Sequence, residues 1–248
     1  MLTILAVAAF CAGIVNALAG GGAFLTFPAL LVSGIPAVDA NASSTVALFP
    51  GQAVTSIASR GELKALPQEW RQDLLSMSII SLVGGTAGAV LLLVTPSDAF
   101  KALVPWLLLV ATVIFAAGTR LDMTSQRRWL GPNAIKLVHG AIAVYGGYFG
   151  GGIGILMLAA LAFYGMRDIR AMNSMKILFA TLMNAAAVVI FIAAGRVHWL
   201  ETSVMMVASM LGGYAGARLS GFLPQTVVKA FVICVGSILT VYFFVKPV

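Results

Sequence analysis

The chain has 248 residues, of which 60% are hydrophobic and only 9% are charged, and its mean hydropathy is +1.02. Ordinary soluble domains do not reach these values, so the composition excludes a soluble globular protein and predicts a polytopic membrane protein embedded in a lipid bilayer. The net charge of +7 does not indicate a nucleic-acid partner, because the basic residues lie in short loops between apolar segments, as membrane orientation alone produces.

Hydropathy and turn signals predict an all-α fold of ten helical segments. In chain order these are 2–19, 22–33, 41–59, 73–94, 99–118, 134–149, 152–164, 171–194, 199–221 and 226–245. As helices, the segments 22–33 and 152–164 would be about 18 Å long, which is shorter than a hydrocarbon core of about 30 Å. We therefore expect both to be broken or re-entrant half-helices.

Each short segment begins at a glycine triplet, either Gly20–Gly22 or Gly150–Gly152. Such a break leaves backbone N–H and C=O groups unpaired at a depth where lipid cannot satisfy them. A helix N-terminus carries about half a positive charge and presents free N–H groups, so an anion is the expected ligand. The alternative is that glycines only permit close helix packing, and we favour that interpretation for the pairs Gly84/Gly88 and Gly212/Gly216.

An internal repeat with an offset of about 130 residues accounts for this duplication. It places the second triplet on the first and Ser174 on Ser43, and it aligns residues 209–217 with residues 81–89. The sequence thus predicts a first transmembrane repeat over 1–118, a cytoplasmic linker over 119–133 and a second transmembrane repeat over 134–248.

The distribution of basic residues bears on the relative orientation of the repeats. If each triplet is a hairpin turn, each half has five segments, the halves are inverted, and eleven basic residues face one side against three on the other. If each triplet lies inside a single crossing, the same residues split nine to five. The positive-inside rule favours the hairpin arrangement, and we expect inverted repeats with both termini outside the cytoplasm.

Two polar clusters open the segments that follow the short helices: Asn41, Ser43 and Ser44 in the first half, and Asn173 and Ser174 in the second. Capping of a helix and contact with a ligand explain these side chains equally well. Lys176 lies about six residues inside its segment, where a charge costs roughly 2.5 to 3.5 kcal/mol at the membrane centre. It either extends to the cytoplasmic interface or supplies positive charge to a bound anion.

At these residues the chain resembles the TauE/SafE sulfite exporter family. The resemblance is carried by residues 19–30, 40–44, 146–154 and 171–176 and covers essentially the whole chain. It implies transport of sulfite or small organosulfur anions such as sulfonates. The second half departs from a simple copy of the first, because Lys176 falls opposite Thr45 and Gly154 opposite Phe24, so two equal sites are not expected.

An enzyme is not expected, since the phosphate-binding, metalloprotease and nucleophile-elbow motifs are missing from the sequence; we predict no catalytic residue, metal or cofactor. An anion channel and an ion-coupled uptake permease remain alternatives to an exporter in the cell inner membrane, and a homodimer is one of the assemblies left open. The expected substrate-binding residues come from the stretches above: Gly20, Gly21, Gly22, Phe24, Thr26, Asn41, Ser43, Ser44, Gly150, Gly151, Gly152, Gly154, Asn173, Ser174 and Lys176.

Overall fold

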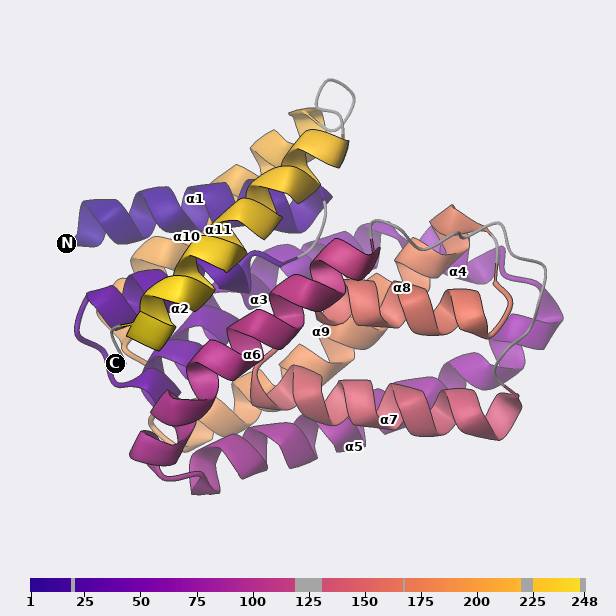
Figure 1. The fold of residues 1–248 in the computed structure, drawn as a ribbon. Helices are drawn as coiled ribbons and strands as arrows, with labels where there is room; N and C mark the ends of the chain where they lie inside the picture. The colour runs from indigo at the N-terminus through magenta and orange to yellow at the C-terminus, as the bar shows by residue number, and fades with distance from the viewer. Residues whose placement is uncertain (19–20, 119–130, 167, 220–224, 246–248) are drawn as a thin grey trace.

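The computed structural model describes residues 1–248 except 19–20, 119–130, 167, 220–224 and 246–248 (Figure 1). The described residues form eleven helices and no strand, which confirms the predicted all-helical fold. The predicted linker over 119–133 lies outside the described residues up to position 130. The helices are α1 (Leu2–Leu18), α2 (Ala23–Val32), α3 (Ala37–Ala58), α4 (Arg60–Lys64), α5 (Gln68–Val94), α6 (Ser97–Gly118), α7 (Pro132–Tyr148), α8 (Ile153–Phe163), α9 (Ile169–Ala193), α10 (Trp199–Leu219) and α11 (Gln225–Val245).

The ten predicted segments coincide with ten of these helices to within five residues at each end. The eleventh, α4, was not predicted, because its five residues RGELK carry no apolar periodicity. By length and composition, two of the described helices could cross a membrane, over Trp70–Val94 in α5 and Arg170–Ala193 in α9. Shorter apolar helices include all of α2 and α8, which have 10 and 11 residues.

The two short helices end in the same way. After α2, the N–H of Gly34 donates to the carbonyl of Leu31 and the N–H of Ile35 to that of Leu30. After α8, Gly165 donates to Ala162 and Met166 to Leu161. Gly34 and Gly165 have φ of +85° and +101°, a region that glycine enters without steric cost. The predicted repeat therefore places equivalent glycines at equivalent helix ends.

The two halves of the chain are interleaved rather than side by side (Figure 1). Helix α1 packs along α10 and α7 packs along α5, so the first helix of each half lies against a late helix of the other half. Likewise α3 packs on α10 and α9 on α5, while α3 and α9, and α6 and α11, pack on each other. Exchanging the halves (α1 for α7, α2 for α8, α3 for α9, α5 for α10, α6 for α11) maps these contacts onto themselves.

Two seams of glycine hold the interleaved pairs together. A Cβ atom on Gly212 would overlap the Phe10 carbonyl of α1, and one on Gly216 would lie 2.8 Å from the Cα of Ile14. In the other pair, a Cβ on Gly84 would overlap Ala143 of α7, and one on Gly88 would overlap the Val144 carbonyl. The packing role predicted for both glycine pairs is confirmed, because any side chain there would force the helices apart.

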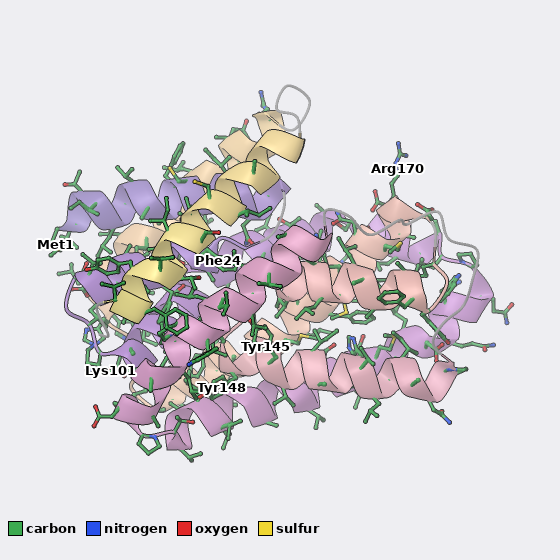
Figure 2. All side chains as sticks on the ribbon, in the orientation of Figure 1. Met1, Phe24, Lys101, Tyr145, Tyr148 and Arg170 are labelled. Atoms are coloured by element: carbon green, nitrogen blue, oxygen red, sulfur yellow. The ribbon has the colours of Figure 1, made fainter. Side chains whose placement is uncertain are left out.

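Labelled residues mark the two ends of the molecule, and its hydrophobic residues form two cores. Figure 2 shows Met1 and Lys101 at one end, which we call the Met1 end, and Arg170 at the other, the Arg170 end. At the Arg170 end, the Lys136 ammonium lies 3.1 Å from an Asp73 carboxylate oxygen. One hydrophobic core is rich in phenylalanine and alanine, whereas the other holds six methionines: Met77, Met157, Met166, Met172, Met175 and Met183.

Candidate functional site

The second glycine triplet forms a sharp turn between α7 and α8. Gly150 and Gly152 have φ of +77° and +75°, so both adopt the left-handed conformation, and Gly152 is the residue that caps the N-terminus of α8. A side chain at either position would be strained by about 1 to 2 kcal/mol. The turn thus depends on glycine at these two positions, and α8 begins inside the protein as a result.

The N-terminus of α8 presents backbone donors. The Gly152 carbonyl accepts from the N–H groups of Ile155 and Leu156 at 3.1 and 3.3 Å, which closes the first turn. Within the described part of the chain, no acceptor faces the N–H groups of Gly152, Ile153 and Gly154. Consecutive free N–H groups at the positive end of a helix dipole are a site for negative charge.

Lys176 of α9 reaches this N-terminus. Its side chain lies beside Gly154, where an added Cβ would be in van der Waals contact with the lysine stem, 3.4 Å from Cδ and 3.9 Å from Cε. Lys176 is partly buried, and among the described residues its ammonium has neither an ion pair nor a hydrogen-bond acceptor. An uncompensated cation beside free N–H groups is arranged to bind an anion.

Tyr145 and Asn41 fix the turn from two sides. The Tyr145 hydroxyl donates to the Gly151 carbonyl at 2.8 Å, and the Asn41 side-chain amide donates to the Tyr148 carbonyl at 3.0 Å. Because the C=O and N–H of one peptide point in opposite directions, the Tyr145 contact directs the Gly152 N–H away from the phenol. Figure 2 shows Tyr145 and Tyr148 together at the end of α7.

Sequence reasoning did not identify Tyr145. The available signal was its position one residue before Gly146 and six residues before Gly151, whose carbonyl its hydroxyl contacts. A tyrosine at this spacing from a glycine is common in helices. Asn41 was identified, although its contact with the opposite half could not be. Aromatic rings cover the turn toward the Met1 end: Phe27 meets Phe149 with ring centroids 5.5 Å apart, and Phe100 meets Tyr148 at 5.6 Å.

The first triplet has a different environment. Gly20 lies outside the described residues, Gly21 has φ of +106°, and Gly22 starts α2 so close to α1 that a Cβ would lie 2.7 Å from the Ala12 carbonyl oxygen. Thr26 interacts with the Gly22 carbonyl at 3.3 Å and with the Ser44 hydroxyl at 2.6 Å. The Phe24 side chain is 2% exposed, so this helix start is packed by an aromatic ring.

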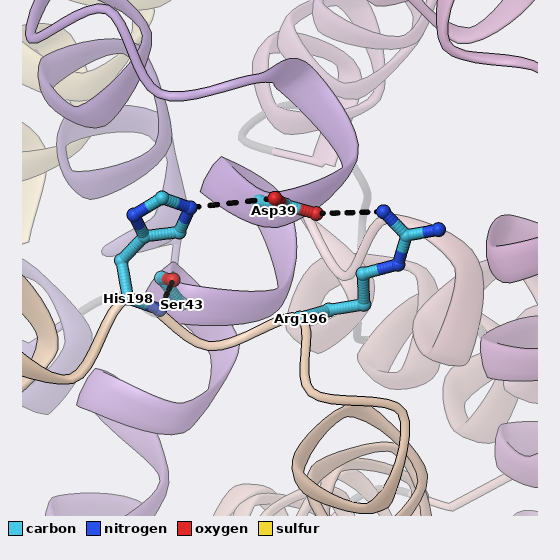
Figure 3. A network of polar contacts seen from close by, with 4 residues as sticks. All are labelled: Asp39, Ser43, Arg196 and His198. Atoms are coloured by element: carbon cyan, nitrogen blue, oxygen red, sulfur yellow. Dashed lines mark hydrogen bonds and ion pairs between the residues drawn. The ribbon is translucent and has the colours of Figure 1, made fainter.

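Ser43 and its repeat mate Ser174 hydrogen bond to different partners within the protein. Figure 3 shows the contacts around Ser43. The Ser43 oxygen accepts from the His198 backbone N–H at 3.0 Å, next to Asp39, whose carboxylate lies 3.5 Å from Arg196 and 3.3 Å from the His198 ring. Its repeat mate Ser174 donates to the Glu62 carboxylate at the Arg170 end.

The structure thus brings together only some of the predicted residues. Gly150, Gly151, Gly152, Gly154 and Lys176 converge at the start of α8. The other predicted side chains pair within the first half, link elements of the two halves, or, in the case of Asn173, are exposed.

Comparisons with known proteins identify the family of the chain and several relatives. The family model described as "Sulfite exporter TauE/SafE" matches residues 5–243. The chain is 30% identical to the probable membrane transporter protein ORF9 of Sinorhizobium sp., over all of this chain and 94% of the relative. It is 27% identical to the probable membrane transporter protein YfcA of Escherichia coli K12 (97% and 88% covered) and to a probable membrane transporter protein of Haemophilus influenzae (97% and 93%). No solved structure matches.

Proposed function

Because the chain belongs to the sulfite exporter TauE/SafE family of membrane transporters, we propose that it exports sulfite or small organosulfur anions across the inner membrane as a secondary transporter. The observation that supports an anion as substrate is the unpaired Lys176 ammonium beside the free N–H groups of α8. Charge-assisted hydrogen bonds from both sources suit the oxygens of a sulfur oxyanion.

In this proposal the site is asymmetric. Gly150, Gly151 and Gly152 set the direction of the backbone donors, Gly154 leaves space for the lysine stem, and Lys176 supplies the charge. The first triplet, with Thr26, Phe24, Asn41 and Ser44 around it, shapes the facing wall. Asn173 lies three residues before Lys176 on the same face of α9, where it would meet the anion on the cytoplasmic side.

The membrane potential is sufficient to drive export. Moving one charge across the membrane changes its free energy by about 2.3 kcal/mol per 100 mV, so a negative cell interior expels an anion without a second ion. The chain has only eight acidic residues. Those with partners in the structure lie in the first two turns of a helix, in the short α4 or at a helix N-terminus: Asp39, Asp73, Glu62 and Asp168. Facilitated export therefore requires no proton relay through the membrane.

We further propose that residues 1–118 and 134–248 are inverted repeats joined by a cytoplasmic linker, and that α2 and α8 are half-helices. The exchange symmetry of the helix contacts supports this arrangement. So do the directions of two helices: α1 begins at the Met1 end, whereas α7 runs from the side of the Arg170 end toward it and stops at Tyr148 inside the molecule (Figure 1). The Arg170 end would then face the cytoplasm and both termini the opposite side.

Ligand binding tests the substrate proposal directly. Purified protein is melted with sulfite, sulfate, thiosulfate, sulfoacetate or taurine. A ligand at about 100 times its Kd stabilises the folded state by about 2.7 kcal/mol, which corresponds to a rise in Tm of roughly 5 to 10 °C. We expect this shift with sulfite or an organosulfur anion and not with Lys176→Met. Absence of any shift, or an equal shift in the variant, would contradict the proposed site.

Transport and orientation need separate measurements. In proteoliposomes, we expect sulfite efflux to saturate with concentration and to accelerate when the interior is made negative. Efflux that responds to a pH gradient but not to potential would contradict facilitated export, and efflux that never saturates would indicate a channel. For orientation, a single cysteine replacing the exposed Thr3, in a chain whose Cys11 and Cys234 are alanine, should react with an impermeant reagent in intact cells, whereas one replacing Arg170 should not.

A further inference from the structure

A second polar position lies deeper along α9 than the proposed site. Lys176, Ala180 and Asn184 are spaced four residues apart and therefore share one face of the helix. At 1.5 Å per residue, Asn184 is about 12 Å from Lys176 along the axis, toward the Met1 end. It is the sixteenth residue of a 25-residue helix, so it lies near the middle of the bundle.

Asn184 meets Gln52 of α3 where the two central helices pack together. The Asn184 side-chain nitrogen donates to the Gln52 side-chain oxygen at 2.6 Å. Thr181, one turn earlier, donates to the Ile177 carbonyl at 2.7 Å and lies 3.5 Å from the Gln52 carbonyl. Both amide side chains are only partly buried. Polar side chains at membrane depth usually face the bundle interior or a water-filled path rather than lipid.

The pair leaves hydrogen-bonding groups unused. One amide–amide contact engages one donor of Asn184 and the oxygen of Gln52. Within the described residues, the two N–H groups of the Gln52 side chain have no acceptor. These N–H groups are neutral donors at the contact between α3 and α9, the helix that also holds Lys176.

We infer that the Gln52–Asn184 pair is a second hydrogen-bonding position for the transported anion, and this inference rests on the proposed function. Toward the Met1 end, the face of α9 beyond Lys176 contains Ala180 and Ala187, which are both buried, and an unpaired charge would be costly beside them. Neutral amide donors lower this barrier, and because they carry no charge they release the anion readily. A pathway needs positions that bind strongly enough for passage and weakly enough for departure.

Isosteric charge substitutions separate this role from packing. Asn184→Asp keeps the shape of the side chain and places a negative charge in the path, and Gln52→Glu does the same from α3. In proteoliposomes loaded with sulfite, we expect either change to lower efflux by about 30-fold or more, given the cost of a charge at that depth. Sulfite binding at Lys176, measured by thermal shift, should remain.

The swapped pair Gln52→Asn with Asn184→Gln is the matched control, because it retains two amides in contact and should recover most of the efflux. If the aspartate variant does not fold, Asn184→Ala decides by the same measurement, with an expected loss of about tenfold. Wild-type efflux in a folded, sulfite-binding Asn184 variant would overturn this inference alone. Failure of the wild type to bind sulfite, or binding unchanged in Lys176→Met, would instead overturn the proposed function.

Discussion

The two glycine breaks have the same sequence pattern and the same place in the repeat, but they present different chemistry. At the second break, the stem of Lys176 lies beside Gly154, next to the backbone N–H groups that open α8. At the first break the corresponding residues are Phe24 and Thr45. Phe24 is buried, and the Thr45 hydroxyl donates to the Asn41 carbonyl at 2.9 Å.

This difference teaches that duplication reproduced the backbone and not the site. The helix ends at Gly34 and Gly165 and the seams at Gly84 and Gly212 are equivalent in both halves, because they satisfy the main chain and allow close packing. In the proposed site, two differences, Gly154 in place of Phe24 and Lys176 in place of Thr45, separate the anion-binding helix start from the packed one. Variants at and away from the second break should therefore differ in sulfite affinity.

The largest effect should follow removal of the lysine charge. Lys176→Met retains the length of the side chain but loses the interaction with the anion, which is worth a few kcal/mol at an intermediate dielectric. We expect sulfite affinity to fall about 100-fold, measured by calorimetry on purified protein. The repeat-related control Thr45→Val should leave the affinity unchanged. A larger loss from the threonine change would place the site at the first break.

Filling the gap at Gly154 should make the second break resemble the first. A leucine there would occupy the line of the Lys176 stem and displace the ammonium, and overpacking of this kind costs about 1 to 3 kcal/mol. We expect Gly154→Leu to weaken sulfite binding about 10- to 100-fold. Gly140→Leu is the matched control, since Gly140 is also helical and an added Cβ there would meet Ile80 at 3.6 Å and not Lys176. Equal losses in both variants would indicate a general effect of removing a helical glycine.

A smaller effect is expected from the phenol that orients the turn. Tyr145→Phe removes the hydrogen bond to the Gly151 carbonyl and leaves the ring, so the Gly152 N–H is less well directed. Loss of one hydrogen bond of about 1 kcal/mol corresponds to roughly fivefold weaker binding. Tyr164→Phe, which loses its bond to Asp73 at 2.7 Å, is a control with the same chemical change away from the site. If only the control reduced affinity, the bracing role of Tyr145 would be wrong.

The smallest effect concerns a cation that already has a partner. Arg196 lies 3.5 Å from Asp39 and its side chain is 47% exposed, so Arg196→Gln should leave sulfite affinity unchanged. Exposed ion pairs contribute about 0.2 to 1 kcal/mol, so we expect Tm to fall by no more than about 4 °C. A clear loss of affinity would show that charge at the Met1 end attracts the anion, and that Lys176 is not the only cation used.

The main-chain architecture could be predicted from sequence because it depends on local signals. The helices at 2–18, 23–32 and 153–163 follow from apolar runs that stop at glycine. The polar contacts could not be predicted, since they depend on which helices of the opposite half come together. Asn41 reaches the Tyr148 carbonyl 107 residues away, and Asn184 reaches Gln52 at a separation of 132.

The same distinction between local signals and tertiary contacts applies to the candidate site residues. Lys176 and the triplet at 150–152 could be identified because a charge or a helix break inside an apolar segment is costly wherever it lies. Ser43 and Ser44 were selected for their chemistry, and hydroxyls of this kind bond readily to a neighbouring backbone or side chain. In the structure Ser43 meets His198 and Ser44 meets Thr26, partners whose proximity is set by tertiary packing.

The glycine seams have a consequence for the integrity of the molecule. Each seam joins a helix of residues 1–118 to a helix of residues 134–248, so neither half encloses its own partner surfaces. The contacts between the two halves therefore hold the molecule together more than the peptide that connects them. Two separately translated polypeptides, 1–118 and 134–248, would therefore be expected to associate in the membrane through these glycine contacts.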